Sequence, residues 1–429
     1  MHILMMTNTF TPHVGGVARS VEAFTASYRQ LGHRVLVVAP EFDNMPSEET
    51  DVVRIPAIQN FNGSDFSVVL PAPGFLRSAV EAFHPDIVHS HHPFLIGSTA
   101  LRLARQLSLP LVFTHHTMYE QYTHYVPGDS ETLKRFVINL STRYANLCDR
   151  VFAPSASIAA VLRRREVVVP IDVVPTGVSL ELMSRGDGAG FRAVMGIPED
   201  AFVIGHVGRL APEKNLGFLA DAVVAFLRSD PRACFLLVGW GPSEAPLRHA
   251  FENAGLTDRL YETGVLTHPI LASAYQAMDL FAFASKSETQ GMVLTEANAA
   301  GVPVVALGAP GVREVVVDGE NGRLLAEESV EAFCSAFRWL AEMAPEQREK
   351  LRQAAKTTAG KFSLKSTAQK ALSIYEAMLG RGISEPSEDD HALRGTLQLI
   401  KAEWDLLMGM AGAAGAALAS DEEGADAQS

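Results

Sequence analysis

The feature that most constrains the fold of this chain is an alternation of short apolar runs with amphipathic helical patterns, which occurs twice. The first series predicts helices at Val17–Leu31, Gly97–Leu107, Glu131–Leu147 and Ala156–Arg164, between strands at His2–Thr7, Val35–Ala39, Val52–Ile55, Ile87–His89, Leu111–Thr114, Val151–Ala153 and Val167–Val174. The second series predicts strands at Phe202–Val207, Cys234–Val238, Leu260–Thr263, Leu280–Ala284, Val304–Ala306 and Gly322–Leu325. Alternation of this kind is typical of βαβ units. The sequence therefore predicts an α/β fold with two Rossmann-like, doubly wound parallel-sheet lobes that face a cleft.

The boundaries between these parts are predicted from breaks in the periodic pattern. The glycine-rich stretch Met183–Gly190 interrupts the periodicity and is the expected linker, which gives lobes at residues 1–182 and 183–362. A helix at Leu364–Leu379, within residues 363–380, is expected to cross back to the first lobe. Residues 381–429 are expected to form a helical extension with an acidic, disordered end.

Composition narrows the class of protein. A chain of 429 residues is too long for a single core. The first 170 residues hold 14 Lys and Arg against 14 Asp and Glu, so the whole net charge of −13 falls on the remainder and no basic face for nucleic acid is expected. Three widely spaced cysteines disfavour a disulfide framework or a zinc site, and the N-terminus lacks the basic region of a signal peptide. A cytoplasmic protein is expected.

Two glutamates eight residues apart mark the first candidate site. Glu288 follows the predicted strand Leu280–Ala284, and Glu296 lies in the helix predicted from Met292. In open α/β sheets ligands bind outside the carboxyl ends of the strands, and the free N–H groups of a helix start attract phosphate. The stretch could therefore hold a phosphorylated, polyhydroxylated ligand. A solvated loop followed by a surface helix stays the alternative.

Three further segments also follow predicted strands. Gly15-Gly16 would let the backbone approach a ligand, although the pair taken alone is better explained by a tight turn with no ligand. Arg209 and Lys214 could clamp a diphosphate, or Arg209 could simply pair with Glu213.

The third of these segments follows the strand that ends at Thr114. It is rich in histidine and tyrosine and suits a sugar or polar head-group pocket, with candidate residues His116, Tyr119, Glu120, Tyr122 and His124. The His89–His92 cluster is not predicted to bind a metal, because no third ligand stands in register with it.

Together these segments resemble the retaining glycosyltransferases of family 4, which have the GT-B fold. The resemblance covers Met1 to about Leu379 and includes Gly15-Gly16, Pro154-Ser155, the Pro175-Thr176-Gly177 turn, GRLAPEKN, and Glu288 with Glu296 as the EX7E motif. Within the family, HTMYEQYTHYVP and SETQGMVLTEA most resemble the bacterial diacylglycerol glucosyltransferases. The neutral first lobe departs from the basic, amphipathic segments by which those enzymes bind membranes.

The resemblance implies a metal-independent, retaining transfer of a hexose from a nucleotide sugar, with UDP-glucose as the leading donor and no other cofactor. The acceptor would be a lipid such as diacylglycerol bound in the first lobe, with a peripheral contact at the inner face of the membrane. A soluble or phosphoinositol-type acceptor and a non-catalytic sugar-nucleotide-binding protein stay open. The implied catalytic residues are His116, Arg209, Lys214 and Glu288; the implied donor-binding residues are Gly15, Gly16, Gly208, Thr289, Gln290, Gly291, Met292, Val293 and Glu296; the implied acceptor residues are Tyr119, Glu120, Tyr122 and His124.

Overall fold

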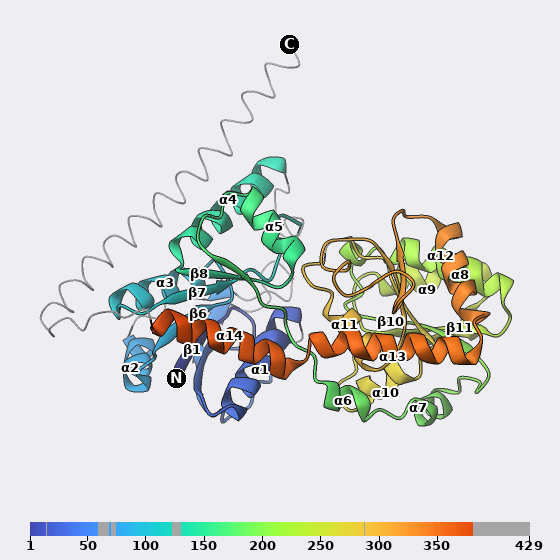
Figure 1. Cartoon of the computed structure of the whole chain (residues 1–429), viewed down its shortest axis with the longest axis horizontal. Helices are drawn as coiled ribbons and strands as arrows, with labels where there is room; N and C mark the ends of the chain where they lie inside the picture. The colour runs from blue at the N-terminus through green and yellow to red at the C-terminus, as the bar shows by residue number, and fades with distance from the viewer. Residues whose placement is uncertain (14, 59–67, 70–73, 122–129, 287, 381–429) are drawn as a thin grey trace, which may run out of the picture. The chain divides into compact units, whose positions relative to one another are not determined.

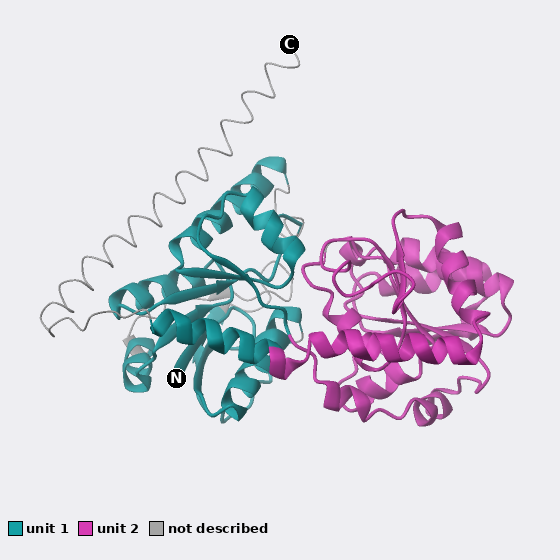
Figure 2. Ribbon diagram, in the orientation of Figure 1, with its two compact units in different colours: residues 1–176, 367–429 teal, residues 177–366 magenta. Residues whose placement is uncertain are grey.

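The computed structural model of the chain describes residues 1–13, 15–58, 68–69, 74–121, 130–286 and 288–380. These residues form two compact units (Figure 2). Unit 1 contains residues 1–176 and the chain from Thr367 to the end of the last helix, and unit 2 contains residues 177–366. Each unit is built on a parallel sheet (Figure 1). The predicted α/β fold with two doubly wound parallel-sheet lobes is therefore confirmed.

Unit 1 has a seven-stranded sheet in the order β3-β2-β1-β6-β7-β8-β9, and every neighbouring pair is parallel. Its strands are short and apolar because helices cover both faces of the sheet. A small antiparallel pair joins β4 (Ala57–Ile58) to β5 (Val68–Val69). The strands of the main sheet are β1 (His2–Met6), β2 (Arg34–Pro40), β3 (Val52–Ile55), β6 (Ile87–Ser90), β7 (Leu111–Thr114), β8 (Arg150–Ala153) and β9 (Ile171–Val173).

The two faces of this sheet carry different helices. One face packs against α2 (Gly74–Phe83), α3 (Ile96–Gln106), α4 (Glu131–Leu147) and α5 (Ala156–Arg164). The other packs against α1 (Gly16–Gln30) and α14 (Leu364–Leu379) (Figure 1). Tyr375 of α14 is fully buried there, and its hydroxyl oxygen lies 2.6 Å from His89 Nδ1. The last described helix is thus part of the core of unit 1.

Unit 2 has a six-stranded parallel sheet in the order β12-β11-β10-β13-β14-β15. Two apolar clusters fill its two faces. The strands are β10 (Phe202–Val207), β11 (Ala233–Val238), β12 (Leu260–Glu262), β13 (Leu280–Phe283), β14 (Val304–Leu307) and β15 (Gly322–Leu325). The helices are α6 (Leu180–Ser184), α7 (Gly188–Met195), α8 (Leu216–Ser229), α9 (Glu244–Ala254), α10 (Ile270–Gln276), α11 (Met292–Ala299), α12 (Val330–Ala341) and α13 (Pro345–Lys361).

The glycine-rich stretch Met183–Gly190 differs from its prediction as a linker. It contains the end of α6 and the start of α7, and both helices belong to unit 2. A Cβ atom on Gly186 would stand 2.6 Å from the carbonyl oxygen of Ala272, and one on Gly188 would stand 2.3 Å from that of Gln276. These glycines therefore serve close packing against α10 within unit 2, and the division between the two units falls after residue 176 rather than after residue 182.

Candidate functional site

The loop after β10 carries the two cations that the sequence singled out. Arg209 Nη2 lies 2.9 Å from Glu213 Oε1, so the predicted alternative of a local salt bridge is the arrangement present in this structure. Lys214 ends a short 3₁₀ turn, Pro212–Lys214, and Asn215 follows in the left-handed region at φ 56°. The Asn215 amide nitrogen donates to the carbonyl oxygen of Ala284, which ties this loop to the loop after β13.

Lys214 and Glu288 are brought together from these two loops, which follow adjacent parallel strands. Lys214 Nζ lies 2.6 Å from Glu288 Oε1, with the side chains 19% and 12% exposed. Burial raises the pKa of the Glu288 carboxyl, but the Lys214 charge and hydrogen bonds from Lys214 and Ser285 outweigh it and hold that pKa below its ordinary value. Glu288 is therefore ionised at neutral pH, in a position to accept further hydrogen bonds.

His206 lies close to this pair, near the end of β10. His206 Nδ1 is 3.0 Å from the carbonyl oxygen of Ala282, and because a carbonyl only accepts, Nδ1 carries the hydrogen. Burial lowers the pKa of His206 to about 4, and the Ala282 carbonyl and Glu288 offset part of that effect while Lys214 adds to it. The ring is thus neutral at neutral pH, with its lone pair on Nε2. That atom is buried without a hydrogen-bond partner among the described residues.

The start of α11 supplies backbone donors and the second glutamate. Gly291 precedes the helix at φ 73°, and the first N–H groups of any α-helix lack an intrahelical acceptor. Gly311 packs so closely on this turn that a Cβ there would stand 2.7 Å from the Gln290 nitrogen. Glu296 is 8% exposed, and its Oε2 accepts a hydrogen bond of 2.7 Å from the Tyr275 hydroxyl of α10. The structure therefore orients Glu296 through Tyr275.

In unit 1, the predicted glycine pair follows β1 and His116 follows β7, so both lie at the carboxyl edge of the parallel sheet. Gly15 is extended at φ −166° and precedes α1, and a Cβ on Gly16 would meet no atom within 4 Å. His116 Nε2 lies 2.9 Å from His91 Nδ1. Burial lowers the pKa of His116 to about 3, so the ring is neutral at neutral pH. His116 could offer a hydrogen bond to a sugar without bringing charge.

Of the four predicted acceptor residues, the structure describes two. Tyr119 and Glu120 lie in a 3₁₀ turn, Tyr119–Gln121, that follows β7. Glu120 Oε1 is 2.7 Å from Arg165 Nη2, and both side chains are less than one-fifth exposed, so this carboxylate is committed to an ion pair. Tyr122 and His124 lie outside the described residues.

Sequence reasoning missed two residues of the unit 2 site. His206 is a lone polar side chain in the apolar strand FVIGHV, and that interruption was the available signal. Tyr275 had no such signal, because one tyrosine in the apolar helix ILASAYQ resembles any core aromatic. Its bond to Glu296 depends on the packing of α10 against the α11 turn.

Two features are absent from the described residues. No group of three or more His, Cys, Asp or Glu side chains there could hold a metal ion. In the same part of the chain, no helix combines the length and the apolar character needed to span a bilayer.

Comparisons with known proteins agree on the class of this chain. Residues 14–182 match the family described as Glycosyltransferase Family 4, and residues 190–358 match Glycosyl transferases group 1. Alpha-monoglucosyldiacylglycerol synthase of Acholeplasma laidlawii is 30% identical over 75% of this chain and 84% of its own length. D-inositol 3-phosphate glycosyltransferase of Segniliparus rotundus is 33% identical over 73% of this chain and 71% of its own.

Among solved structures, sucrose-phosphate synthase of Thermosynechococcus elongatus superposes with a TM-score of 0.74 at 22% identity. The match covers 89% of this chain and all of that one. At this identity the likeness concerns the fold.

Proposed function

Because the chain belongs to the family-4 glycosyltransferases and has their GT-B fold, we propose that it transfers glucose from UDP-glucose to the hydroxyl of diacylglycerol, with retention at the anomeric carbon. The observation that carries the proposal is the Lys214–Glu288 pair, which joins a cation and a carboxylate at the carboxyl edge of unit 2. The synthase from Acholeplasma laidlawii supports the sugar and the acceptor by its name and its 30% identity.

In this proposal the positive side chains of unit 2 meet the charge of the leaving diphosphate. Lys214 and Arg209 bind its oxygens, and the N–H groups of Met292 and Val293 at the start of α11 add to them. In this proposal Arg209, whose side chain is 39% exposed, rotates away from Glu213 to bind phosphate. These residues supply enough charge that the proposal needs no metal ion.

Two carboxylates hold the rest of the donor. Glu288, kept ionised by Lys214, accepts hydrogen bonds from sugar hydroxyls near the reacting carbon. Glu296, oriented by Tyr275, accepts from the ribose hydroxyls. The bond from the anomeric carbon to the phosphate oxygen breaks while the acceptor oxygen bonds the same face of that carbon. The acceptor proton passes to the leaving phosphate oxygen, so no protein nucleophile takes part.

A neutral acceptor is favoured by the chemistry of the unit 1 edge. Burial lowers the pKa of His115 and His116 to about 3, and that of His91 well below its ordinary value, so these rings carry no charge at neutral pH. Arg165, which could bind a phosphate, is paired with Glu120. Neutral donors and acceptors suit a glycerol hydroxyl better than a phosphorylated polyol. The 33% identity to an inositol-phosphate glycosyltransferase makes that acceptor the second candidate.

The test is a transfer assay with purified full-length protein and radiolabelled UDP-glucose or GDP-mannose. Diacylglycerol vesicles, inositol 3-phosphate and buffer alone serve as the three acceptor arms. We expect an α-glucosyl lipid in the vesicle arm only, identified by the anomeric coupling constant in its NMR spectrum. If the label is transferred to inositol 3-phosphate and not to the vesicles, the acceptor is the second candidate and not the lipid. A β-linked product would refute retention.

A further inference from the structure

The Nε2 atom of His206 is a buried acceptor that finds no hydrogen-bond partner in the described parts of the chain. Burying an acceptor without a partner destabilises a fold, so such an atom calls for an explanation. His206 has no exposed surface. It lies in β10, the strand that leads into the loop carrying Lys214. The missing partner is therefore expected from the protein or from a ligand at this edge.

The ring of His206 is fixed in orientation. Nδ1 donates to the carbonyl oxygen of Ala282 on the neighbouring strand, 3.0 Å away. The ring stacks on Phe281 and Phe283, with centroids 5.9 and 6.0 Å apart. Nε2 then faces Gly208, where a Cβ would stand 3.6 Å from it. Nε2 thus lies beside the first residue of the loop that carries Arg209 and Lys214.

We propose that His206 is a positioning residue for Lys214, whose ammonium donates to His206 Nε2 when it engages the donor diphosphate. This inference rests on the proposed function, which places a diphosphate at Lys214. An ammonium has three hydrogens, so in the donor complex it can donate to Glu288 Oε1, to a phosphate oxygen and to His206 Nε2. Lysine is a point charge on a flexible stem, so three acceptors are what define its position.

The identity of residue 206 follows from this role. A neutral imidazole adds an acceptor beside the ammonium without repelling it, which an arginine or lysine at this position would do. Asparagine could keep the bond to Ala282 but has no atom at the distal position. Glutamine reaches further and can place its carbonyl oxygen near the site of Nε2. The pair His206→Asn and His206→Gln therefore separates the distal acceptor from the rest of the ring.

The experiment measures UDP affinity by calorimetry on the full-length protein, together with the thermal unfolding midpoint of each variant. We expect His206→Asn to weaken UDP binding by about tenfold and His206→Gln to stay within about threefold of wild type. Both variants lose the aromatic stacking, so their unfolding midpoints should fall together. Equal affinities for the two variants, or wild-type affinity for His206→Asn, would overturn the role.

A double-mutant cycle adds a test that a purely structural role would not pass. Lys214→Met removes the ammonium and should weaken UDP binding by about 10- to 100-fold. His206→Asn in that background should cost no more than about twofold, because its effect passes through Lys214. Losses that multiply would overturn the inference. If the wild type transfers glucose but the losses in UDP affinity multiply, the proposed function holds and the positioning role of His206 does not. If the losses are coupled but the wild type shows no transfer, the positioning role holds and the proposed function does not.

Discussion

The two ends of strand β13 each carry a buried carboxylate paired with a cation, but the two pairs are built differently. Asp279 precedes the strand and lies 2.9 Å from Arg192 Nη2, whereas Glu288 follows it and lies 2.6 Å from Lys214 Nζ. Both carboxylates are less than one-fifth exposed. The comparison therefore isolates what the partners do, because strand and burial are shared.

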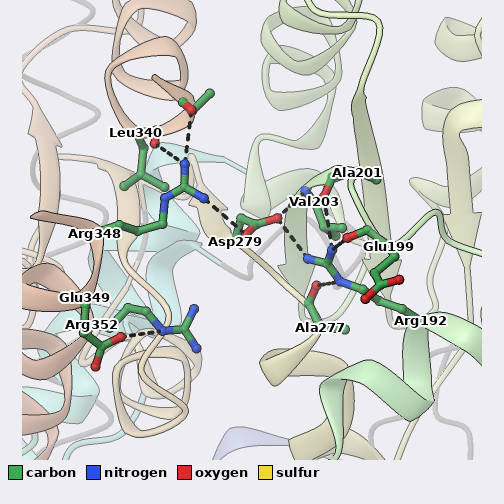
Figure 3. A network of polar contacts seen from close by, with 11 residues as sticks. Arg192, Glu199, Ala201, Val203, Ala277, Asp279, Leu340, Arg348, Glu349 and Arg352 are labelled. Carbon is green, nitrogen blue, oxygen red and sulfur yellow. Dashed lines mark hydrogen bonds and ion pairs between the residues drawn. The ribbon is translucent and has the colours of Figure 1, made fainter. Parts of the chain in front are cut away.

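At the amino end, both members of the pair are also hydrogen-bonded to backbone atoms (Figure 3). Asp279 Oδ2 also accepts from the Val203 nitrogen, and Arg192 donates to the carbonyl oxygens of Ala277 and Ala201. Arg348 of α13 lies on the other side, 3.9 Å from Asp279 Oδ1. A planar guanidinium suits this task because its five hydrogens point in fixed directions. This end fastens α7 and α13 to the sheet.

At the carboxyl end, the cation is a lysine, and it is paired with the carboxylate side chain of Glu288. Lys214 bonds Glu288 while the nearby His206 Nε2 has no partner among the residues described. An ammonium can redirect its hydrogens when a ligand arrives, which a guanidinium fixed by backbone carbonyls does not do. The two ends therefore share burial and ion pairing, but they differ in the type of cation and in the buried His206 Nε2, which has no partner among the described residues.

The largest effect is expected from Glu288→Gln. This change removes the charge that Lys214 orients and leaves a buried ammonium without its counter-ion, so turnover of UDP-glucose should fall by at least about 100-fold. The measurement is kcat with saturating acceptor. Glu349→Gln, which alters an exposed carboxylate on α13, is the matched control and should keep wild-type turnover. Wild-type turnover in Glu288→Gln would remove Glu288 from the reaction.

Asp279→Ala should show the opposite profile. It leaves Arg192 buried without its carboxylate and the Val203 nitrogen without an acceptor, so unfolding should be easier by about 2–4 kcal/mol. Turnover per folded molecule should stay near wild type, because the change lies at the far end of β13. Urea unfolding and kcat at a temperature well below the unfolding midpoint measure the two quantities. A selective loss of kcat would break the comparison.

Glu296→Ala tests a third carboxylate, one held by a neutral partner. Its role at the ribose predicts a donor KM raised by about tenfold with little change in kcat, because the ribose lies away from the reacting carbon. Tyr275→Phe keeps the ring and removes only the hydroxyl, so a smaller rise is expected. Steady-state kinetics at varied UDP-glucose measures both. A fall in kcat alone would place Glu296 at the sugar instead.

The sequence was sufficient for the fold because parallel strands buried on both faces must be apolar. Strands such as Leu111–Thr114 and Phe202–Val207 have the bounds that were predicted from their apolar runs. The close packing of Gly186 and Gly188 against α10 could not be predicted, since a glycine required by close packing and one in a linker are identical in sequence. The helix α2 was also missed.

For the candidate site, the sheet topology was a better guide to which residues lie close together than their spacing in the sequence. Lys214 and Glu288 could be placed at one sheet edge, because the loops after neighbouring parallel strands meet there. Their direct contact, the bond from Tyr275 to Glu296 and the ion pair of Glu120 with Arg165 depend on side-chain directions. Those directions are set by tertiary packing, which no local pattern records.

The smallest effect concerns the pH dependence of the Lys214–Glu288 pair. The folded pKa of Glu288 lies below its ordinary value of 4.5, so the ionised pair stabilises the fold above that value and ceases to do so as pH falls through the folded pKa. Lys214→Met removes the cation, and burial then raises the pKa of Glu288. The two proteins should therefore differ by about 1 kcal/mol in unfolding free energy at about pH 7 and converge as pH falls below the folded pKa of Glu288.

Urea titrations across that range, followed by the fluorescence of Trp339 in unit 2, measure this difference. Lys350→Gln, on the exposed surface of α13, should run parallel to wild type at every pH. A gap between wild type and Lys214→Met that does not change with pH would mean that Lys214 stabilises the unit through its methylene stem rather than its charge. In that case the carboxyl end of β13 would be stabilised by the packing of the Lys214 stem. The Arg192–Asp279 pair and the Lys214–Glu288 pair would then differ in geometry and not in the stabilising effect of charge.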